Sequence, residues 1–218
     1  VMLKNMGASI ERQGDKILVH PLKSTLKSID ISVPSDPSSS AFFAGLAVIT
    51  KNSKLKLTNV LLNESRIGFV EVLKRMNSMI SQSNESLHNG EKVGDLTFSS
   101  SNLKAIEVEP EIIPSIIDEI PILAVVAAFA NGTTVFKNVE ELKYKECNRL
   151  SAIIHNLEAF GIKAYENNNN LFVEGGTVKK MAEITTFDDH RIAMAFTILS
   201  LTSFKKYKLD NTQCVDIS

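Results

Sequence analysis

The stretch "IDEIPILAVVAAFANGTTVFKNV" (residues 117–139) shows the pattern on which the chain is built. Acidic residues open it, a run of small and aliphatic residues follows, and a short alternating segment ends near an asparagine. A run that is apolar all round predicts a helix buried among close neighbours. The alternation after it predicts a strand.

The same pattern occurs twice more, as "SSSAFFAGLAVITKNSKLKLTNV" (38–60) and "DDHRIAMAFTILSLTSFKKYKLDN" (188–211). Its period of about 75 residues indicates one supersecondary unit, roughly β-α-β-α-β-β, used several times. The predicted fold class is therefore α+β, with buried helices and mixed sheets. If the three units pack about a shared axis, their helix starts converge.

Helix ends followed by hairpins alternate with these stretches, from Leu3, Leu73 and Leu157. The chain opens inside such a helix end and closes directly after a strand, so we expect a fragment of a longer polypeptide. The Ser/Asn/Glu-rich residues 81–111 predict a solvated loop with an extra hairpin.

Composition excludes several classes of function. The chain has 218 residues, a formal net charge of -1 and 44% hydrophobic residues, which favours neither nucleic acid nor an acidic membrane as a partner. No apolar run approaches the ~20 residues of a membrane helix. Cys147 and Cys214 lack the paired spacing of a zinc site and suit a reducing compartment. We therefore expect a cytoplasmic globular protein.

Polar clusters open all three buried helices, at residues 35–40, 117–119 and 188–191. Any one cluster alone is explained by N-capping. Together, converging helix N-termini would favour an anion through their backbone N–H groups. His190 and Arg191 exceed what a cap needs, and a cation is misplaced at a helix N-terminus, so Arg191 is predicted to serve a ligand.

A further charged cluster opens the predicted helix 144–161, with Lys145, Glu146 and Arg149 in its first turn. Their spacing lets the three side chains point at one spot. Taken alone, the cluster is best explained as a solvated turn with a local ion pair. Beside the converging helix starts, two cations around one carboxylate favour phosphate or carboxylate binding.

Two other groups in these motifs have chemical potential. Asp118 and Glu119 precede an apolar helix, where burial can raise the pKa of a carboxylate toward that of a general base. Cys147 has no histidine close in sequence to activate it, which favours a buried small residue over a nucleophile.

Taken together, "VPSDPSSSAFF", "NESRIGFVEVLKRM", "IPSIIDEIPILAVVAAFANGTT", "ELKYKECNRL" and "FDDHRIAM" resemble, in order and spacing, the C-terminal half of the 5-enolpyruvylshikimate-3-phosphate (EPSP) synthase family. The resemblance implies two similar domains, each of three units around a pseudo-threefold axis, with the active site between them. Residues 1–33 would then be the tail of the other domain, and residues 34–218 most of the domain in the C-terminal half.

The resemblance also implies a reaction, in which phosphoenolpyruvate gives its enolpyruvyl group to shikimate 3-phosphate and phosphate leaves. No metal or organic cofactor is expected. The implied partners are these two substrates and the missing N-terminal half of the polypeptide. By the same resemblance, Asp118 binds the shikimate hydroxyls and removes the 5-hydroxyl proton, Lys145 lies near that hydroxyl, and Glu146 protonates the methylene carbon.

The remaining implied roles concern anion binding. Arg149 and Arg191 would hold the carboxylate or phosphate of phosphoenolpyruvate, where glyphosate competes. Asp189 and His190 would orient Arg191 or contact the reacting groups.

The sequence departs from the family pattern at several positions. Cys147 and Asn148 stand where Ser or Thr and then Asp are usual, Ser35 replaces a common Gly, and Ile217 falls about where some members carry a substrate-binding lysine. Two other functions remain open: an enolpyruvyl transferase that acts on a UDP-amino sugar, and a non-catalytic domain that only keeps the repeat fold. The lone fragment is expected to have little or no turnover.

Overall fold

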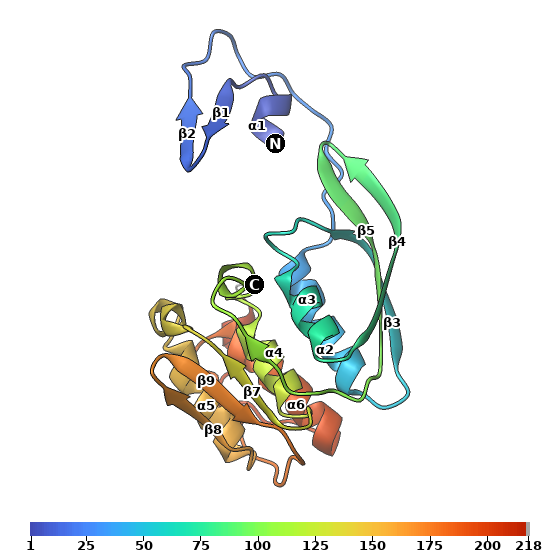
Figure 1. Cartoon of the computed structure of the whole chain (residues 1–218), viewed down its shortest axis with the longest axis vertical. Coiled ribbons are helices and arrows are strands. Elements are labelled where there is room, and N and C mark those ends of the chain that lie inside the picture. The colour runs from blue at the N-terminus through green and yellow to red at the C-terminus, as the bar shows by residue number, and fades with distance from the viewer. Residues whose placement is uncertain (217–218) are drawn as a thin grey trace.

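A computed structural model describes residues 1–216 (Figure 1). Ile217, one of the positions that depart from the family pattern, lies outside the described residues. The helices are α1 (Met2–Asn5), α2 (Pro37–Ile49), α3 (Gly68–Arg75), α4 (Ile120–Ala127), α5 (Arg149–Ala159) and α6 (His190–Phe204), with short 3-10 helices η1 (Ile113–Ser115), η2 (Glu140–Tyr144) and η3 (Gln213–Val215). The strands are β1 (Ile10–Gln13), β2 (Lys16–Val19), β3 (Lys54–Leu61), β4 (Met79–His88), β5 (Glu91–Ser99), β6 (Glu107–Val108), β7 (Thr133–Phe136), β8 (Ala164–Asn167) and β9 (Asn170–Glu174).

The strands form three sheets, in the orders β1-β2, β3-β5-β4 and β6-β7-β9-β8. The last sheet is mixed, because β6 pairs parallel to β7 while the other neighbours are antiparallel. Isolated parallel bridges join Ser35 to Val60, Lys104 to Asn131 and Ile184 to Leu209. Each bridge links the chain before a buried helix to the chain after it, so the repeat predicted from the sequence recurs around α2, α4 and α6.

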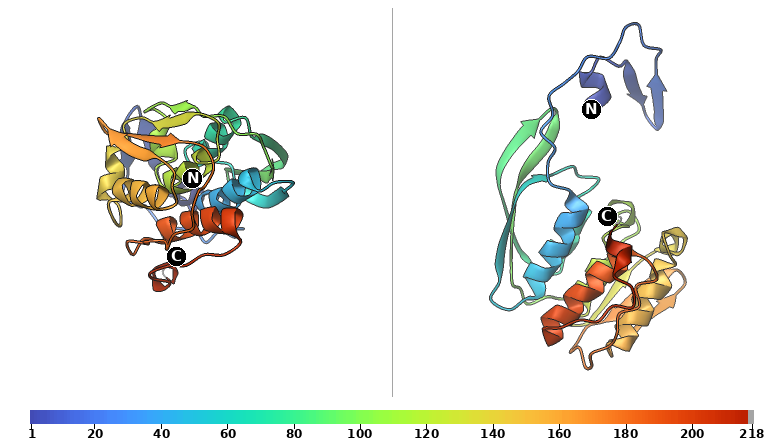
Figure 2. Two further views of the ribbon diagram at one scale, coloured as in Figure 1. Left: turned by 90° about the horizontal axis from the view of Figure 1, so that it is seen from below. Right: turned by 180° about the vertical axis from the view of Figure 1, so that it is seen from behind.

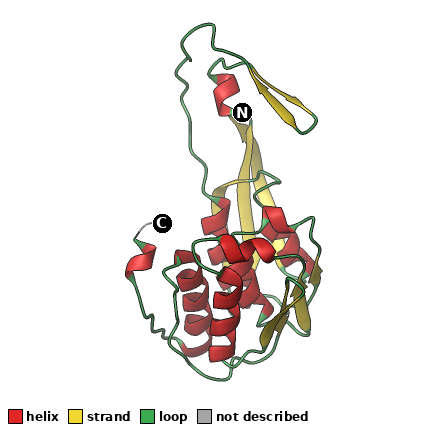
Figure 3. Cartoon of the chain, turned by 90° about the vertical axis from the view of Figure 1, so that its left-hand side faces the viewer, coloured by secondary structure: helices red, strands yellow, loops and turns green. Residues whose placement is uncertain are grey.

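The three inner helices pack against one another at the centre of the main body, as the side view shows (Figure 3). Every residue of α4 is buried. Gly45 of α2 packs tightly on α4, because an added Cβ would lie 2.7 Å from the side chain of Ile122. Small residues are therefore required for this approach. Among residues 1–216, no helix is both long and apolar enough to cross a bilayer.

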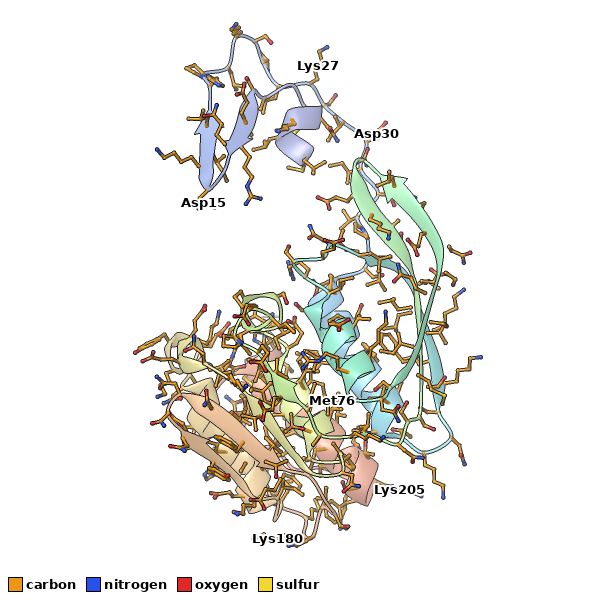
Figure 4. All side chains as sticks on the ribbon, viewed as in Figure 1. Asp15, Lys27, Asp30, Met76, Lys180 and Lys205 are labelled. Carbon is orange, nitrogen blue, oxygen red and sulfur yellow. The ribbon has the colours of Figure 1, made fainter. Side chains whose placement is uncertain are left out.

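Residues 1–33 stand apart from the main body. None of them is buried. Figures 1 and 2 show α1, β1 and β2 joined to the rest by a long extended segment, and in Figure 4 the labelled Asp15 and Lys27 lie far from Lys180 and Lys205. The side chain of Asn5 donates to the carbonyl of Asn89 at the tip of the β4–β5 hairpin. The domain boundary at 33/34 stays a prediction.

The hairpin predicted within 81–111 is present, but the prediction that it is an addition to a solvated loop is wrong. Residues 79–99 form one long hairpin, β4–β5, which is the hairpin of the first unit itself. Its inner strand contributes Val93, Leu96 and Phe98 to the core. The pattern was obscured because β4 is exposed along almost its whole length and carries polar residues on both faces.

Asp95 on β5 holds the irregular part of this sheet together. The pairing register shifts in β3 between Leu57 and Val60 and in β4 between Ser83 and Ser86. At these bulges Asn59 and Asn84 adopt positive φ angles of 54°. The Asp95 carboxylate accepts from the Asn59 backbone N–H (3.0 Å) and the Asn84 side chain (2.7 Å), and it pairs with Lys56 (2.8 Å).

Asp95→Asn is predicted to lower the melting temperature at pH 7 on the order of 5 °C, because two of its donors lose a charged acceptor. Hydrogen bonds from Lys56, Asn59 and Asn84 lower the pKa of Asp95 to about 2. A carboxyl group whose pKa is lowered in the folded state stabilises the fold at pH values above its ordinary pKa. This stabilisation is lost as the pH falls toward the lowered pKa. The difference between the two proteins should therefore shrink from pH 4 toward pH 2.

Thermal unfolding of the full chain across this pH range measures the effect. Glu91→Gln, on the same strand, is the matched control and should melt near the unmodified protein. Equal melting of Asp95→Asn and Glu91→Gln at pH 7 would contradict the prediction.

Candidate active site

The starts of α4 and α6 meet through Asp118 and Arg191. Arg191 Nη1 donates to the Asp118 backbone carbonyl at 3.2 Å, and Nη2 lies 3.4 Å from Oδ2 of its carboxylate. Asp118 directly precedes the N-cap of α4, and Arg191 lies in the first turn of α6. Arg191 thus points away from its own helix dipole toward an acidic side chain of the neighbouring unit, which relieves its unfavourable position.

The backbone N–H groups at two of the three helix starts already have acceptors. Asp36 accepts from Ser39 N at 2.8 Å at the start of α2. Asp189 accepts from Arg191 N at 2.8 Å and Ile192 N at 3.3 Å at the start of α6. Capping carboxylates therefore occupy part of the backbone donors of the predicted anion site at α2 and α6, and the site itself stays a prediction. Cationic side chains must supply the attraction.

Arg149 is the centre of the cluster. It is fully buried (0% exposed), and each of its nitrogens reaches a different carboxylate. Nε donates to Asp189 Oδ2 at 2.7 Å, Nη1 to Asp118 Oδ1 at 3.0 Å, and Nη2 to Glu146. The planar guanidinium suits this fixed fork of acceptors, which a lysine could not span. Asp189, also 0% exposed, thus orients Arg149 by its side chain and Arg191 only through the backbone.

Lys145 and Glu146 do not lie in the first turn of a helix, contrary to prediction. Helix α5 begins at Arg149 because Asn148 caps it, accepting from Ser151 N at 3.1 Å. Lys145 and Glu146 instead lie on the short connection from η2. They still face the cluster: Lys145 Nζ lies 3.8 Å from Asp118 Oδ1 and 3.2 Å from Glu141 Oε1.

The neighbouring carboxyl groups of Asp118 and Glu119 are shifted in opposite directions. Burial opposes ionisation of Asp118, but Arg191, Lys145 and Arg149 together outweigh it and lower its pKa. Burial raises the pKa of Glu119, and a hydrogen bond with Ser38 only partly offsets this. The expected rise therefore holds for Glu119 and is wrong for Asp118, because its cations lie far along the chain, Arg191 in another unit, and not in the local apolar sequence.

His190 and Cys147 border the cluster. His190 is the first residue of α6, and its Nδ1 is buried without a hydrogen-bond partner among the described residues. With Arg191 and Ser38 it lines a hollow of about 710 Å³ between α2 and α6. Cys147 Sγ lies 3.7 Å from Asp189 Oδ2. Burial and this carboxylate raise the pKa of Cys147 to about 12, so its thiol stays protonated and is no nucleophile.

The arrangement suits an anionic ligand with a hydroxyl group. The side chains of Arg191 and Lys145 are 17% and 23% exposed, so both can be reached from solvent, whereas an anion can reach Arg149 only if Glu146 or Asp118 moves aside. Asp118, at 39% exposed, offers an ionised acceptor between these cations. In the described part of the chain, no three His, Cys, Asp or Glu side chains are placed to hold a metal ion.

Arg66 and Ser38 belong to the same neighbourhood but were given no role from the sequence. Arg66 Nη2 donates to Ser38 Oγ at 3.2 Å and pairs with Asp36 Oδ1 at 3.3 Å. In the sequence, Ser38 is explained as part of a helix start. Arg66 is a charged residue in a loop, and such residues are ordinarily solvated. The only sequence feature that points to Arg66 is the motif that contains it. That motif carries no chemistry on its own.

Comparisons with known proteins identify what this geometry resembles. A family model described as EPSP synthase (3-phosphoshikimate 1-carboxyvinyltransferase) matches residues 1–218. A 3-phosphoshikimate 1-carboxyvinyltransferase of Clostridium tetani is 43% identical over 219 residues, which cover 100% of this chain and 49% of the relative. That of Petrotoga mobilis is 41% identical, with 100% and 50% covered. The chain spans about half the length of the curated relatives it matches.

Solved structures agree. A 2.37 Å structure of EPSP synthase from Acinetobacter baumannii matches with a TM-score of 0.91 at 33% identity, covering 98% of this chain and 50% of that one. The enolpyruvyl transferase NikO from Streptomyces tendae matches at 0.70 with 19% identity, covering 98% and 48%, and shows a shared fold alone. The resemblance found in the motifs and the predicted α+β fold class are confirmed.

Arg149→Ala is predicted to lower the free energy of unfolding by about 3–5 kcal/mol, because it leaves the buried Asp189 carboxylate without its cation. Arg149→Lys should also lower the free energy of unfolding, but by a smaller amount, since one ammonium group cannot reach all three carboxylates. Urea unfolding of the full chain provides the measurement. The control Lys163→Ala removes an exposed pair with Glu174 and should change little. Similar unfolding of Arg149→Ala and this control would contradict the prediction.

Cys147 is predicted to alkylate slowly. In a Cys214→Ser variant it is the only cysteine, and at pH 8 its reaction with iodoacetamide should be at least about tenfold slower than that of a free cysteine, because little thiolate is present. The rate should keep rising beyond pH 10, since the pKa of Cys147 is raised to about 12. Mass spectrometry follows the modification. A rate that levels off near the ordinary thiol pKa of about 8.5 would refute this.

Proposed function

The chain belongs to the EPSP synthase family, and from this membership we propose that it supplies half of an enzyme that transfers the enolpyruvyl group of phosphoenolpyruvate to the 5-hydroxyl of shikimate 3-phosphate. The observation that carries the proposal is the single cluster in which Arg149, Arg191 and Lys145 surround the Asp118 carboxylate. Both substrates are anionic, and such a cluster supplies fixed positive charge beside a group that can accept a hydroxyl proton.

Asp118 is proposed to orient the 5-hydroxyl and to take its proton as the oxygen attacks carbon 2 of phosphoenolpyruvate, with Lys145 beside that hydroxyl. The lowered pKa of Asp118 keeps it ionised and ready to accept. An anion bound at Arg191 and Lys145 offsets part of the positive charge responsible for that low pKa. Substrate binding therefore raises the basicity of Asp118 when it is needed.

Glu146 is proposed to give a proton to carbon 3, forming the tetrahedral intermediate. Phosphate then leaves as the carbon–oxygen bond breaks and takes up the proton that Asp118 accepted, and the proton from carbon 3 returns to Glu146. Arg191 holds the carboxylate or phosphate of phosphoenolpyruvate, and Arg149, kept in place by Asp189, joins it once Glu146 turns away from it toward the substrate. His190, next to Arg191 at the start of α6, is proposed to orient Arg191 or to contact the reacting groups from the hollow that both residues line.

The other half of the site is proposed to come from the part of the relatives that this chain does not span. Residues 1–33, which contain no buried residue, are proposed to belong to the other domain. Residues 34–218 are proposed to form most of the domain of the C-terminal half. The free thiols of Cys147 and Cys214 support the proposal that the enzyme works in the cytoplasm.

Phosphate release from shikimate 3-phosphate plus phosphoenolpyruvate tests the proposal. This chain alone is expected to be silent, and the chain fused to the N-terminal half of the Clostridium tetani relative is expected to turn over. UDP-N-acetylglucosamine in place of shikimate 3-phosphate should give no release. A soluble fusion that is silent with both acceptors would refute the proposed activity.

Arg191→Ala in that fusion should reduce kcat/KM at least about a hundredfold, because a charge-assisted contact to an anionic substrate is lost. Arg75→Ala is the matched control, since Arg75 lies at the end of α3 and donates to the Glu107 carbonyl. Equal kcat/KM values for the two variants would remove Arg191 from the proposed site.

A further inference from the structure

The turn that leads into α6 has an unusual backbone. Phe187 and Asp188 both lie in the left-handed region, with φ angles of 53° and 57°. Bulky residues such as phenylalanine rarely adopt this conformation, and two such residues in succession persist only where surrounding contacts impose them. The turn ends at Asp189, whose carboxylate accepts from Arg149 Nε at 2.7 Å and from Arg191 N at 2.8 Å. Whatever imposes the turn therefore bears on the position of both arginines.

One of these contacts comes from Asn156, a polar residue of α5 with no exposed surface (0%). Its side-chain amide pairs with Thr185 as a neighbouring strand would. Nδ2 donates to the Thr185 carbonyl at 2.9 Å, and Oδ1 accepts from Thr185 N at 3.0 Å. Nδ2 also donates to the Ala152 carbonyl, one turn back along α5, at 2.9 Å. Both donors and the oxygen of the amide are thus used, so its orientation is fixed.

Helix α5 consequently holds the turn at both of its ends. Arg149 and Asn156 are the two polar side chains among the buried residues described in α5. They lie about two helical turns apart on one face, since about 3.6 residues make a turn. Arg149 contacts Asp189 at the end of the turn, while Asn156 contacts Thr185 at its start. The left-handed pair lies between these two points.

The other side of the turn is held by residues that follow α6. Asp210 Oδ1 accepts from Thr186 N at 3.0 Å, and Asn211 Nδ2 donates to Asp188 Oδ1 at 2.7 Å. These bonds join the turn to its own repeat unit. Asn156 instead ties the start of the turn to the helix that carries Arg149, so it sets the turn relative to the candidate site.

We propose that Asn156 is a positioning residue, which holds the start of the turn and so keeps the Asp189 carboxylate in place. Through Asp189 it orients Arg149 and Arg191 for the phosphoenolpyruvate anion. The proposal rests on the proposed function in one respect, that these arginines bind phosphoenolpyruvate. A merely structural role for Asn156 would affect melting but leave the contacts of Asp189 in the folded protein unchanged.

The first test needs no substrate. The chain contains five arginines, so the Nε–H signal of Arg149 can be assigned by NMR with single Arg→Lys variants of the other four. Asn156→Ala should shift this signal and make its exchange with solvent at least about tenfold faster, because its acceptor on Asp189 is no longer fixed. Asn156→Leu, which nearly keeps the side-chain volume but makes no hydrogen bonds, should do the same.

The matched control is Ser200→Ala, which deletes another buried side-chain bond to a carbonyl, that of Lys206 at 2.7 Å near the end of α6. It should leave the position and exchange of the Arg149 signal unchanged. An unchanged Arg149 signal in either Asn156 variant, once circular dichroism shows that the variant is folded, would overturn the proposal.

A glycine at the strained position should reduce the dependence on Asn156. Glycine adopts positive φ without steric cost, so Phe187→Gly should keep the shape of the turn with weaker support. Combined with it, Asn156→Ala should slow the exchange of the Arg149 signal to within about threefold of Phe187→Gly alone, whereas a merely structural role predicts additive effects. If both Asn156 variants fail to fold and Phe187→Gly does not restore folding, the proposal is equally overturned.

The second test uses turnover by the fusion with the N-terminal half of the Clostridium tetani relative. Asn156→Ala should raise KM for phosphoenolpyruvate at least about fivefold, because the arginines proposed to bind this anion lose their fixed acceptor. KM for shikimate 3-phosphate should stay within about twofold. A smaller folded fraction alone would lower kcat and leave both KM values unchanged. Ser200→Ala should leave both KM values unchanged.

The two tests separate the two proposals. A silent unmodified fusion refutes the activity, while the Arg149 signal still decides whether Asn156 keeps Asp189 in place. An active fusion in which Asn156→Ala leaves KM for phosphoenolpyruvate unchanged overturns the positioning role and leaves the activity standing.

Discussion

Close packing of α2, α4 and α6 is the constraint on which the rest of the structure depends. Helix α4 is buried on every side, and α2 approaches it at a glycine. Helices this apolar carry charged residues only at their ends. The capping residues of the three helices, Asp36, Glu119 and Asp189, are therefore brought near one another by the packing that excludes charge from the core. The candidate site is a consequence of that exclusion.

The charges gathered there balance one another closely. Arg149, fully buried, is tolerated because three carboxylates surround it, and Asp189, equally buried, is tolerated because Arg149 and two backbone N–H groups bond it. The side chains toward solvent, Lys145 and Arg191, are the ones that can exchange a protein partner for a ligand. Rigidity inside and accessibility outside are what a site for anionic substrates requires.

Much of this could be predicted from the sequence, and the failures have physical causes. The buried runs and their repetition are local patterns, so the α+β fold followed from them. The contact of Glu146 with Arg149 followed from their spacing, although Asn148 begins the helix later than expected. The low pKa of Asp118 could not be predicted locally, because its cations lie far along the chain and one of them, Arg191, belongs to another unit. The contacts of Arg66 could not be predicted from its motif, since its partners lie about 30 residues away along the chain.

The different surroundings of Asp118 and Glu119 also bear on how such a protein can evolve in length. Each residue added to a helix rotates the residues beyond it by about 100°. An insertion or deletion of one residue at the start of α4 would turn both carboxyl groups away from their present surroundings, including Arg149 for Asp118. The tip of the β4–β5 hairpin, where Asn89 and Gly90 turn at the surface, lies outside the candidate site, so a change of length there would disturb only contacts with residues 1–33. Gaps in alignments of its relatives should gather at that tip and avoid the two residues before α4.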